Sequence, residues 1–305
     1  MKIIIFGSTG LVGSSLSRVL PVHFPNATII YSKRENLNLF SYKDTYDYLN
    51  KEKPDVVVNA AAKVGGINAN NNFRTEFILE NLKINMNILE SLINLQKTFL
   101  INLGSSCIYP INVKNPISEQ SLMSGILEPT NSPYAMAKLT AIEIGDAISK
   151  QYGNKIINLM PTNLYGPNDN FDNFNSHVIP GLIQRMHKAK INNEKVFNVW
   201  GSGKPLREFL YVDDLSKAIA IVIKKKPDFK LMNIGSGEEI SISNLVKLLK
   251  KILKYDGEII FNLEMPDGNP RKLLDSSLIN SLGWKSETNL LKGLNFTYDW
   301  YLNRI

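Results

Sequence analysis

Cysteine and long apolar runs are scarce in this sequence, and each shortage excludes a class of protein. The 305 residues include one cysteine, Cys107, so the chain cannot form an internal disulfide, which fits a reducing cytoplasm. No apolar run approaches the ~20 residues that span a bilayer. The chain begins with a strand-like run instead of a signal peptide. We therefore expect a cytoplasmic protein that does not bind a membrane.

Clustered charge is lacking as well. The chain carries 35 Lys and Arg against 28 Asp and Glu, a formal net charge of +7, but these cations are scattered. A nucleic-acid binder needs a basic stripe with interleaved aromatic residues, and we find none, so we expect no nucleic-acid partner. We expect no metal site either. A mildly basic enzyme still attracts a polyanionic small ligand.

A strand, a glycine-rich turn and a helix follow one another at the N-terminus. Residues 2–6 form an apolar run, and Gly7, Gly10 and Gly13 follow at three-residue spacing before a helical pattern. Gly7 permits a tight turn, Gly10 lets the backbone approach a pyrophosphate, and Gly13 lets the helix pack on the strand. The arrangement is typical of a dinucleotide-binding site, although glycine spacing alone is weak evidence.

The first 167 residues repeat a strand–helix pattern, which predicts a Rossmann-type, doubly wound α/β fold with a parallel sheet. The expected strands are residues 2–6, 27–31, 55–58, 98–103 and 155–159. The expected helices are residues 14–20, 42–50, 77–95 and 132–152. Small or reactive residues follow the later strands at their carboxyl ends, where open α/β sheets bind ligands.

After residue 167 the rhythm changes, and the pattern predicts a smaller, interleaved C-terminal α/β part. Residues 168–176 have the composition of a loop lying over a site. Helices are expected at 177–188, 215–224, 242–253 and 290–301, and strands at 195–200, 207–212, 231–234 and 258–261. We assign 1–167 to an NADP(H)-binding domain, its sheet completed by part of 207–235, and 168–305 mainly to a substrate-binding domain.

The residues after the second strand favour NADPH over NADH. NAD-binding Rossmann domains place an acidic residue there, against the ribose 2′-hydroxyl. Here Lys33 and Arg34 follow the strand, and two cations suit a 2′-phosphate. Glu35 weakens this interpretation, and a charged surface turn is the plainer alternative.

Tyr134 and Lys138 are four residues apart in a predicted helix, so their side chains lie on one face. Pro133 at the first helical turn and Ser132 before it favour that helix. A lysine cation beside the phenol is expected to lower the tyrosine pKa, and such a pair transfers a proton to or from a carbonyl oxygen near neutral pH. The spacing alone also occurs by chance in ordinary amphipathic helices.

Several further stretches carry a specific resemblance. They accompany the glycine turn, Ser105 and the Tyr134–Lys138 pair, and they are residues 61–67, 104–110, 161–167, 175–180, 199–203, 207–210 and 266–275. On these motifs the chain resembles the extended short-chain dehydrogenase/reductase family of NAD-dependent epimerases and dehydratases, and within it the GDP-L-fucose synthases. The likeness covers essentially the whole chain in the same order.

The resemblance implies a reaction. NADPH would reduce the carbon-4 ketone of GDP-4-keto-6-deoxy-mannose after carbons 3 and 5 have been epimerised. Tyr134 would donate the proton to the ketone oxygen, Lys138 would hold the nicotinamide ribose, and Ser105 would hydrogen-bond the same oxygen. Cys107 and His177 would supply the base and acid of epimerisation, because both side chains titrate near neutrality once perturbed.

Cys107 and His177 also have plainer interpretations. A single cysteine is more often a small buried apolar residue, and a histidine in this position is more often a satisfied residue at a helix start. If the strand continued through Ser105, Cys107 would share its face because the two are two residues apart. The family motif is what favours the catalytic interpretation of both.

The resemblance also implies ligand-binding residues and an oligomeric state. The cofactor-binding set is Gly7, Ser8, Thr9, Gly10, Leu11, Val12, Gly13, Arg34, Ala61, Leu103, Gly104, Lys138, Pro161, Asn163, Leu164 and His177. Cations suit a diphosphate and a tryptophan packs on sugar or base, and the GDP-sugar set is Arg185, Trp200, Arg207 and Lys272. The family expectation is a homodimer, in which residues 77–95 and 132–152 form a four-helix bundle with their mates.

Three functions remain open at this stage. The first is the epimerase-reductase acting on a GDP-4-keto-6-deoxy-hexose. The second is a carbon-4 reductase without epimerase activity on a related sugar such as a GDP-heptose, since retention of Cys107 and His177 does not prove epimerisation. The third is a non-catalytic dinucleotide-binding regulator, which the joint presence of Ser105, Tyr134 and Lys138 disfavours.

Overall fold

The core of the protein is a six-stranded parallel sheet. The computed structural model describes residues 1–172, 175–265 and 267–305. The sheet order is β2 (Thr28–Ser32), β1 (Lys2–Phe6), β3 (Val56–Asn59), β4 (Phe99–Leu103), β5 (Ile156–Pro161) and β9 (Leu231–Ile234), and every neighbouring pair is parallel. Strand order changes direction between β1 and β3, which is where ligands bind in open α/β sheets.

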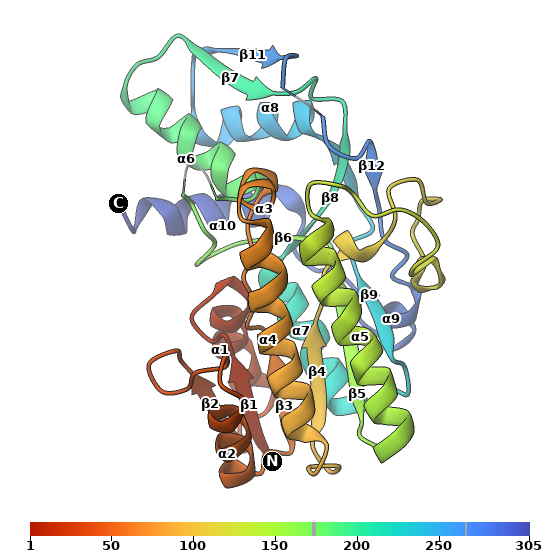
Figure 1. The fold of residues 1–305 in the computed structure, drawn as a ribbon. Coiled ribbons are helices and arrows are strands. Elements are labelled where there is room, and N and C mark those ends of the chain that lie inside the picture. The colour runs from red at the N-terminus through yellow and green to blue at the C-terminus, as the bar shows by residue number, and fades with distance from the viewer. Residues whose placement is uncertain (173–174, 266) are drawn as a thin grey trace.

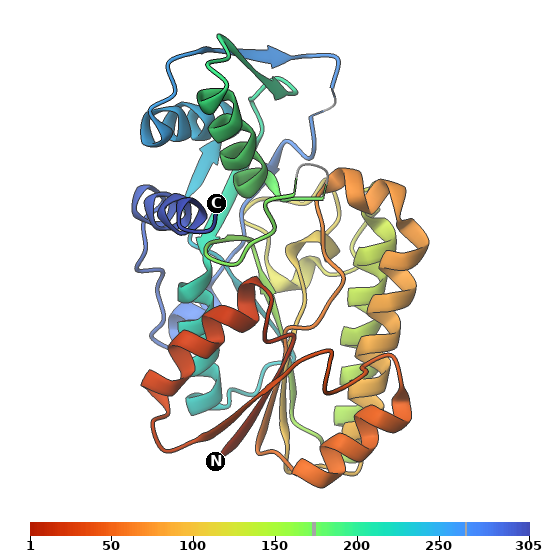
Figure 2. The same ribbon diagram turned by 90° about the vertical axis from the view of Figure 1, so that its left-hand side faces the viewer.

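Helices cover both faces of this sheet (Figures 1 and 2). One face carries α2 (Tyr42–Glu52), α4 (Arg74–Leu92) and α5 (Ser132–Tyr152). The other carries α1 (Leu11–His23), α7 (Val212–Lys225) and the short α9 (Ser277–Ser281). The middle strands are therefore buried on both sides, and Ile3 to Phe6 are 0% exposed. This burial explains why β1 is a continuous apolar run instead of an alternating one.

The predicted doubly wound fold is confirmed, with differences at the ends of elements. The first helix begins at Leu11, directly after the glycine turn, and includes Pro21. The long helix predicted over 77–95 spans Arg74–Leu92, and a short helix, α3 (Ile67–Asn72), precedes it. Strand β9 comes from the C-terminal half of the sequence and pairs with β5, so the two halves of the chain share one sheet.

A smaller α/β part lies beyond the carboxyl ends of the sheet strands (Figure 1). It has its own apolar core around Ile183, Phe197 and Leu249. Short strands β6 (Asn163–Tyr165), β10 (Glu239–Ser241) and β12 (Arg271–Lys272) associate with β8 (Leu206–Tyr211), and β7 (Val196–Trp200) pairs with β11 (Glu258–Asn262). The helices of this part are α6 (Val178–Ile191), α8 (Ile242–Leu253) and α10 (Leu290–Leu302).

Two predicted segments extend beyond the described residues. Residues 173 and 174 of the predicted loop 168–176 lie outside them, as does residue 266 of the motif 266–275. Within the described residues, no helix is long and apolar enough to cross a membrane.

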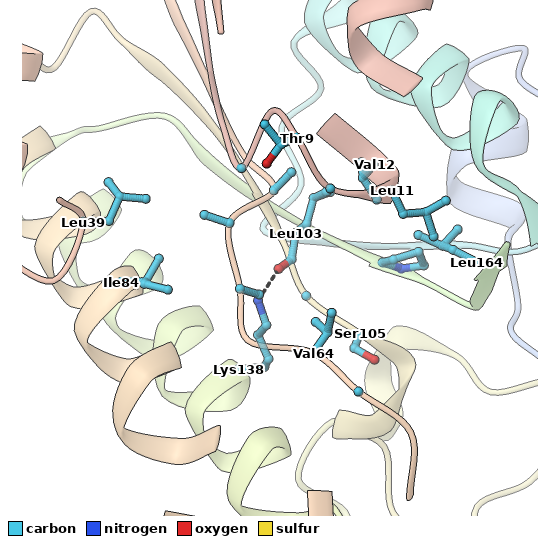
Figure 3. A pocket seen from close by; sticks show the side chains of 18 of the residues that line it. Thr9, Leu11, Val12, Leu39, Val64, Ile84, Leu103, Ser105, Lys138 and Leu164 are labelled. Atoms are coloured by element: carbon cyan, nitrogen blue, oxygen red, sulfur yellow. Dashed lines mark hydrogen bonds between the residues drawn. The ribbon is translucent and has the colours of Figure 1, made fainter. Parts of the chain in front are cut away.

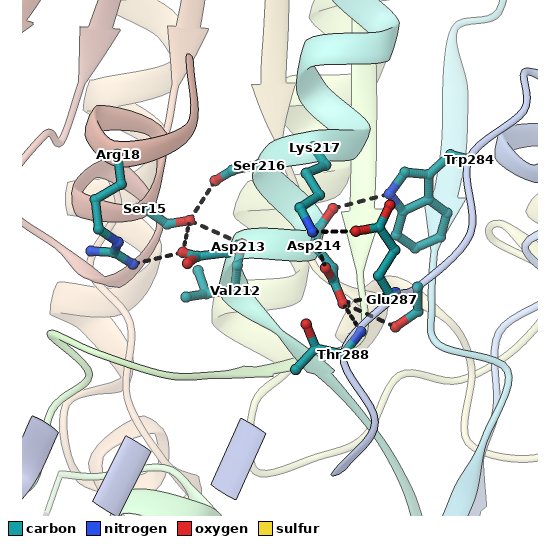
Figure 4. A network of polar contacts seen from close by, with 11 residues as sticks. Ser15, Arg18, Val212, Asp213, Asp214, Ser216, Lys217, Trp284, Glu287 and Thr288 are labelled. Atoms are coloured by element: carbon teal, nitrogen blue, oxygen red, sulfur yellow. Dashed lines mark hydrogen bonds and ion pairs between the residues drawn. The ribbon is translucent and has the colours of Figure 1, made fainter. Parts of the chain in front are cut away.

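Two adjacent carboxylates at the start of α7 connect this helix to α1 and to the segment before α10 (Figure 4). Asp213 accepts hydrogen bonds from the Ser15 hydroxyl and the Arg18 guanidinium on α1, both at 2.6 Å. Asp214 is 0% exposed, and its Oδ2 accepts from the backbone N–H of Thr288 at 2.7 Å and of Glu287 at 3.1 Å. These bonds hold the segment leading into α10 against α7.

The Asp214 carboxylate makes a testable contribution to stability. Asp214→Asn should lower the free energy of unfolding by about 2–3 kcal/mol, because the amide leaves buried N–H donors poorly paired. Urea denaturation measures the change. Glu287→Gln is the matched control: Glu287 is a 68% exposed partner of Lys217, so its loss should cost below about 1 kcal/mol. Equal effects of the two substitutions would contradict the assignment.

Candidate active site

A cavity of about 500 Å³ lies at the carboxyl ends of the sheet strands. Residues that follow β1, β2, β3, β4 and β5 line it, together with residues of α5 and the start of α6. Of the predicted site residues, those in its wall are Gly7, Thr9, Gly10, Leu11, Val12, Arg34, Ala61, Leu103, Gly104, Ser105, Tyr134, Lys138, Pro161, Asn163, Leu164 and His177. One cavity thus gathers side chains that are distant in the sequence.

The glycine turn has the geometry that a pyrophosphate needs. Gly7 has φ +74°, a left-handed conformation, and a Cβ there would lie 2.7 Å from the Ala60 backbone. At Gly10, a Cβ would meet only the Gly7 oxygen, at 3.7 Å. The turn therefore leaves open space beside Gly10, at the N-terminus of α1, where backbone N–H groups favour an anion.

Two predicted cofactor residues lie behind the cavity wall instead of in it. The Ser8 hydroxyl donates to the Ser32 carbonyl at 2.9 Å and so ties the turn to β2. A Cβ at Gly13 would lie 2.1 Å from the Gly7 carbonyl oxygen. Gly13 therefore allows α1 to pack closely on the turn, as the sequence predicts.

The two ends of the cavity differ in chemistry. Lys33 and Arg34 lie at the end beside β2, next to the apolar side chains of Leu37 and Leu39. Tyr134 and Lys138 lie toward the end beside β4 and β5. An extended dinucleotide fits this arrangement, with its adenosine phosphate beside the cations and its nicotinamide beside the tyrosine.

Buried asparagines shape the wall that follows β3. The Asn81 side chain is 0% exposed. Its Oδ1 accepts from the Lys63 N–H at 3.1 Å, and its Nδ2 donates to the Lys63 carbonyl at 3.0 Å. Asn59 Oδ1 accepts from the Ala61 N–H at 3.1 Å. These bonds satisfy backbone groups that would otherwise lack partners in an irregular segment, and so fix residues 60–65 against the cavity.

The Lys138 side chain reaches the end of β4, where it bonds Leu103 (Figure 3). Lys138 is only 3% exposed, and its Nζ donates a hydrogen bond to the Leu103 carbonyl at 2.8 Å. Nζ lies 5.8 Å from the centre of the Tyr134 ring. Burial lowers the Lys138 pKa to about 8, so the amine is still largely protonated at pH 7.

The expected fall in the Tyr134 pKa is wrong for the protein without cofactor. Desolvation raises the Tyr134 pKa above its ordinary value. The hydrogen bond with the nearby Ser105 hydroxyl lowers it, but this effect is smaller than that of desolvation. The Lys138 amine faces the ring and bonds the Leu103 carbonyl instead of the phenol oxygen. Tyr134 is therefore a neutral phenol here, which is the form that donates a proton.

Ser105 and Cys107 do not share a strand face, contrary to the expectation from their spacing. Strand β4 ends at Leu103, and Ser105 caps a short 3₁₀ turn, Ser106–Ile108. The Cys107 N–H donates to Ser105 Oγ at 3.4 Å. Ser105 lines the cavity and Cys107 does not. Cys107 is 7% exposed, and burial raises its pKa, while Lys272, Ser105 and Lys138 oppose that shift.

His177 and Asp169 complete the wall beside α6. His177 is the N-cap residue of α6 and lines the cavity, and burial lowers its pKa. Asp169 was not predicted: it lines the same cavity, its Oδ2 has no hydrogen-bond partner among the residues that the structure describes, and burial raises its pKa to about 7. Nothing in the sequence separates Asp169 from its Asn-rich neighbours, because only the folded loop encloses its carboxyl group.

The four predicted GDP-sugar residues lie outside this cavity, in the smaller α/β part. The Arg185 guanidinium lies 5.5 Å from the centre of the 54% exposed Trp200 ring. Arg207 and Lys272 are register partners on β8 and β12. Burial lowers the Lys272 pKa, and its charge also acts on Cys107. Lys272 therefore lies within electrostatic reach of Cys107, whose N–H bonds the cavity residue Ser105.

Metal ligation has no support in the part of the chain that the structure describes. No group of three or more His, Cys, Asp or Glu side chains there is arranged to hold a metal ion.

Comparisons with known proteins agree with this site. A family model described as the NAD dependent epimerase/dehydratase family matches residues 3–235. GDP-L-fucose synthase 1 of Arabidopsis thaliana is 45% identical over 305 residues, which cover 100% of this chain and 94% of that protein.

Two solved structures are similar over nearly the full length. A GDP-6-OMe-4-keto-L-xylo-heptose reductase from C. jejuni has a TM-score of 0.93 at 31% identity, covering 100% of this chain and 98% of that chain. A GDP-L-fucose synthetase from Naegleria fowleri bound to NADP has a TM-score of 0.90 at 27% identity, covering 99% and 93%. With the glycine turn, the Tyr134–Lys138 pair and the family match in agreement, this chain belongs to the NAD dependent epimerase/dehydratase family.

Proposed function

We propose that this protein uses NADPH to reduce the carbon-4 ketone of a GDP-4-keto-6-deoxy-hexose, and that it also epimerises carbons 3 and 5. The observation that carries the proposal is the convergence of Ser105, Tyr134 and Lys138 on one wall of a dinucleotide-sized cavity. The relatives named GDP-L-fucose synthase support the identity of the substrate.

NADPH supplies the hydride when it is bound, and the residues of the chain handle the proton and the charge. Tyr134 holds the proton that the ketone oxygen receives. Ser105 Oγ lies beside it and stabilises negative charge that develops on that oxygen. Burial lowers the Lys138 pKa to about 8, so the amine is largely protonated at pH 7. Its positive charge favours the phenolate that Tyr134 becomes after donating the proton.

Epimerisation is assigned to Cys107 and His177. The ketone acidifies the adjacent C–H bonds, so a base on one face of the sugar and an acid on the other suffice. The Cys107 thiol lies within the electrostatic reach of Lys138 and Lys272, whose charges favour the reactive thiolate. His177 lies across the site on the α6 side.

The two parts of the chain are proposed to bind different ligands, because they carry different binding residues. Residues 1–167, with the sheet completed by β9, are proposed to bind the cofactor. Residues 168–305 are proposed to bind most of the GDP-sugar through Arg185, Trp200, Arg207 and Lys272. The guanidinium on an open aromatic ring at Trp200 suits a nucleotide base or sugar.

A homodimer in the cytoplasm is also proposed. Exposed apolar side chains lie on the two long helices that pack side by side: Leu79 and Met86 on α4, and Met136 and Tyr152 on α5, each between 40% and 48% exposed. Pairing these helices with those of a second copy would bury this surface, as in a four-helix bundle.

A second candidate is a carbon-4 reductase without epimerase activity, acting on a GDP-heptose. The similarity to the C. jejuni heptose reductase favours it, as does the position of Cys107 outside the cavity wall.

Turnover in deuterated water separates these functions. The protein is incubated with NADPH and GDP-4-keto-6-deoxy-mannose in D₂O, and the product is examined by NMR and mass spectrometry. We expect NADPH consumption with deuterium at carbons 3 and 5. Consumption without deuterium would establish the reductase alone. Absence of turnover on this substrate and on GDP-4-keto-heptoses would contradict both candidates.

Removing the phenol hydroxyl should stop the reduction. Tyr134→Phe should lower kcat by about 10²- to 10⁴-fold, because the proton donor is lost, while NADPH binding, followed by fluorescence, persists. Tyr42→Phe, at an exposed tyrosine that begins α2 and does not line the cavity, is the matched control and should leave kcat unchanged. A Tyr134→Phe variant with more than a tenth of the normal kcat would remove Tyr134 from the role of proton donor, whereas cellular function that survives Tyr134→Phe intact would favour the non-catalytic regulator.

Cys107 should control proton exchange separately from reduction. Cys107→Ser should abolish deuterium incorporation while leaving hydride transfer to a pre-epimerised 4-keto sugar intact. Because burial raises the Cys107 pKa, the thiolate fraction and the exchange rate should rise between pH 6 and pH 9 in the unmodified protein. An exchange rate that is flat over this range would remove Cys107 from the role of base.

A further inference from the structure

Glu208 is a buried carboxylate between the cofactor cavity and the GDP-sugar residues. It lies in β8 and is 0% exposed. Its Oε1 accepts from the Gly237 N–H at 2.8 Å, and its Oε2 accepts from the Leu274 N–H at 3.1 Å. No cation pairs with it in the part of the chain that the structure describes. The carboxylate is therefore held by one backbone donor at each oxygen, and the Thr162 hydroxyl also interacts with it.

The backbone of Glu208 contacts the cavity wall. Its carbonyl accepts from the Asn163 side-chain amide at 2.8 Å and from the Thr162 hydroxyl at 3.2 Å. Thr162 and Asn163 both line the cofactor cavity. One residue thus contacts the wall of that cavity through its carbonyl and two distant loops through its carboxylate.

The loop at Gly235 is shaped around the same carboxylate. A Cβ at Gly235 would lie 2.3 Å from Glu208 Oε1, so a side chain at that position would displace the acid. The close approach is independent of the two hydrogen bonds. It indicates that the space for the Glu208 side chain is built into the fold.

The Leu274 bond bears on the position of Lys272. Strand β12 is two residues long, and it pairs Arg271 with Leu206 and Lys272 with Arg207. So short a strand has few ladder bonds to fix its register. Leu274 lies two residues beyond Lys272, and its N–H is anchored by Glu208, the neighbour of Arg207 on β8.

We propose that Glu208 is a positioning residue for substrate binding: its carboxylate fixes β12 against β8 and so holds Lys272 at the GDP-sugar beside Cys107. The identity of that ligand rests on the proposed function. A glutamine cannot replace the acid, because its amide nitrogen is a donor and would face either the Gly237 or the Leu274 N–H. An inserted donor there would push the 273–275 segment away from β8.

A double-mutant cycle on ligand binding tests this proposal. The probe is GDP-mannose, which carries a hydroxyl at carbon 4 and so offers NADPH no ketone to reduce. Calorimetry measures its Kd for the NADPH-loaded full chain, for Glu208→Gln, for Lys272→Ala and for the double variant. We expect Glu208→Gln to raise this Kd about tenfold, the equivalent of one lost charged hydrogen bond, with the NADPH Kd changed less than twofold. The double variant should bind no more weakly than Lys272→Ala, because Glu208 acts through Lys272.

Asp214→Asn is the matched control. It makes the same chemical change at another 0% exposed carboxylate that accepts backbone N–H groups, but remote from the ligand residues. It should lower stability and leave both Kd values unchanged. If Glu208→Gln fails to fold, Glu208→Asp, which keeps the charge but is one methylene too short, is held to the same criteria.

Three results would overturn the proposal. They are a GDP-mannose Kd within twofold of normal in the Glu208 variant, additive losses in the double variant, and equal weakening of NADPH and GDP-mannose, which would indicate a general structural role. The proposed function fails separately. A wild-type protein that binds GDP-mannose but turns over no 4-keto sugar would contradict the function alone, whereas wild-type protein that binds no GDP-mannose would contradict both.

Discussion

The site depends on a charged amine held where water does not reach. Lys138 Nζ bonds the Leu103 carbonyl at 2.8 Å, and this bond joins α5 to the end of β4. It places Tyr134, one helical turn away, opposite Ser105, which follows the same strand. Desolvation lowers the Lys138 pKa and raises that of Tyr134. The free protein therefore holds Tyr134 as a neutral phenol, which is the form that the proposed reduction needs as its proton donor.

The parallel sheet turns this local arrangement into a site for two ligands. Carboxyl ends of β1 to β5 meet above the sheet, so the glycine turn, the cations after β2 and the Tyr134–Lys138 pair share one cavity. The chain then leaves the sheet to build the smaller part and returns to it as β9. Asp213 and Asp214 join α7 to α1 and to the segment before α10, and Glu208 joins β8 to the segment that follows Lys272, so the packing of the two parts rests on directional bonds as well as apolar contacts.

The sequence predicts those features that local chemistry determines. The apolar runs predicted the buried strands, and the three glycines predicted the turn. The four-residue spacing predicted that Tyr134 and Lys138 lie on one face of a helix. Features that depend on burial in the folded chain were missed or wrongly predicted. The sign of the Tyr134 pKa shift depends on desolvation, Cys107 lies in a 3₁₀ turn that its spacing does not reveal, and Asp169 is unremarkable until the loop folds over it. The role of Glu208 depends on bonds to residues 29 and 66 positions away.

The pKa of the Lys138 amine in the free protein tests this account most directly. It can be measured by NMR titration of protein labelled with ¹³C at the lysine Cε, with Lys138→Arg to assign the signal. The account predicts a pKa of about 8, because burial without a carboxylate partner disfavours the cation. A value at or above the ordinary lysine pKa of about 10.4 would contradict it, since the amine would then be solvated or paired with an anion instead of desolvated.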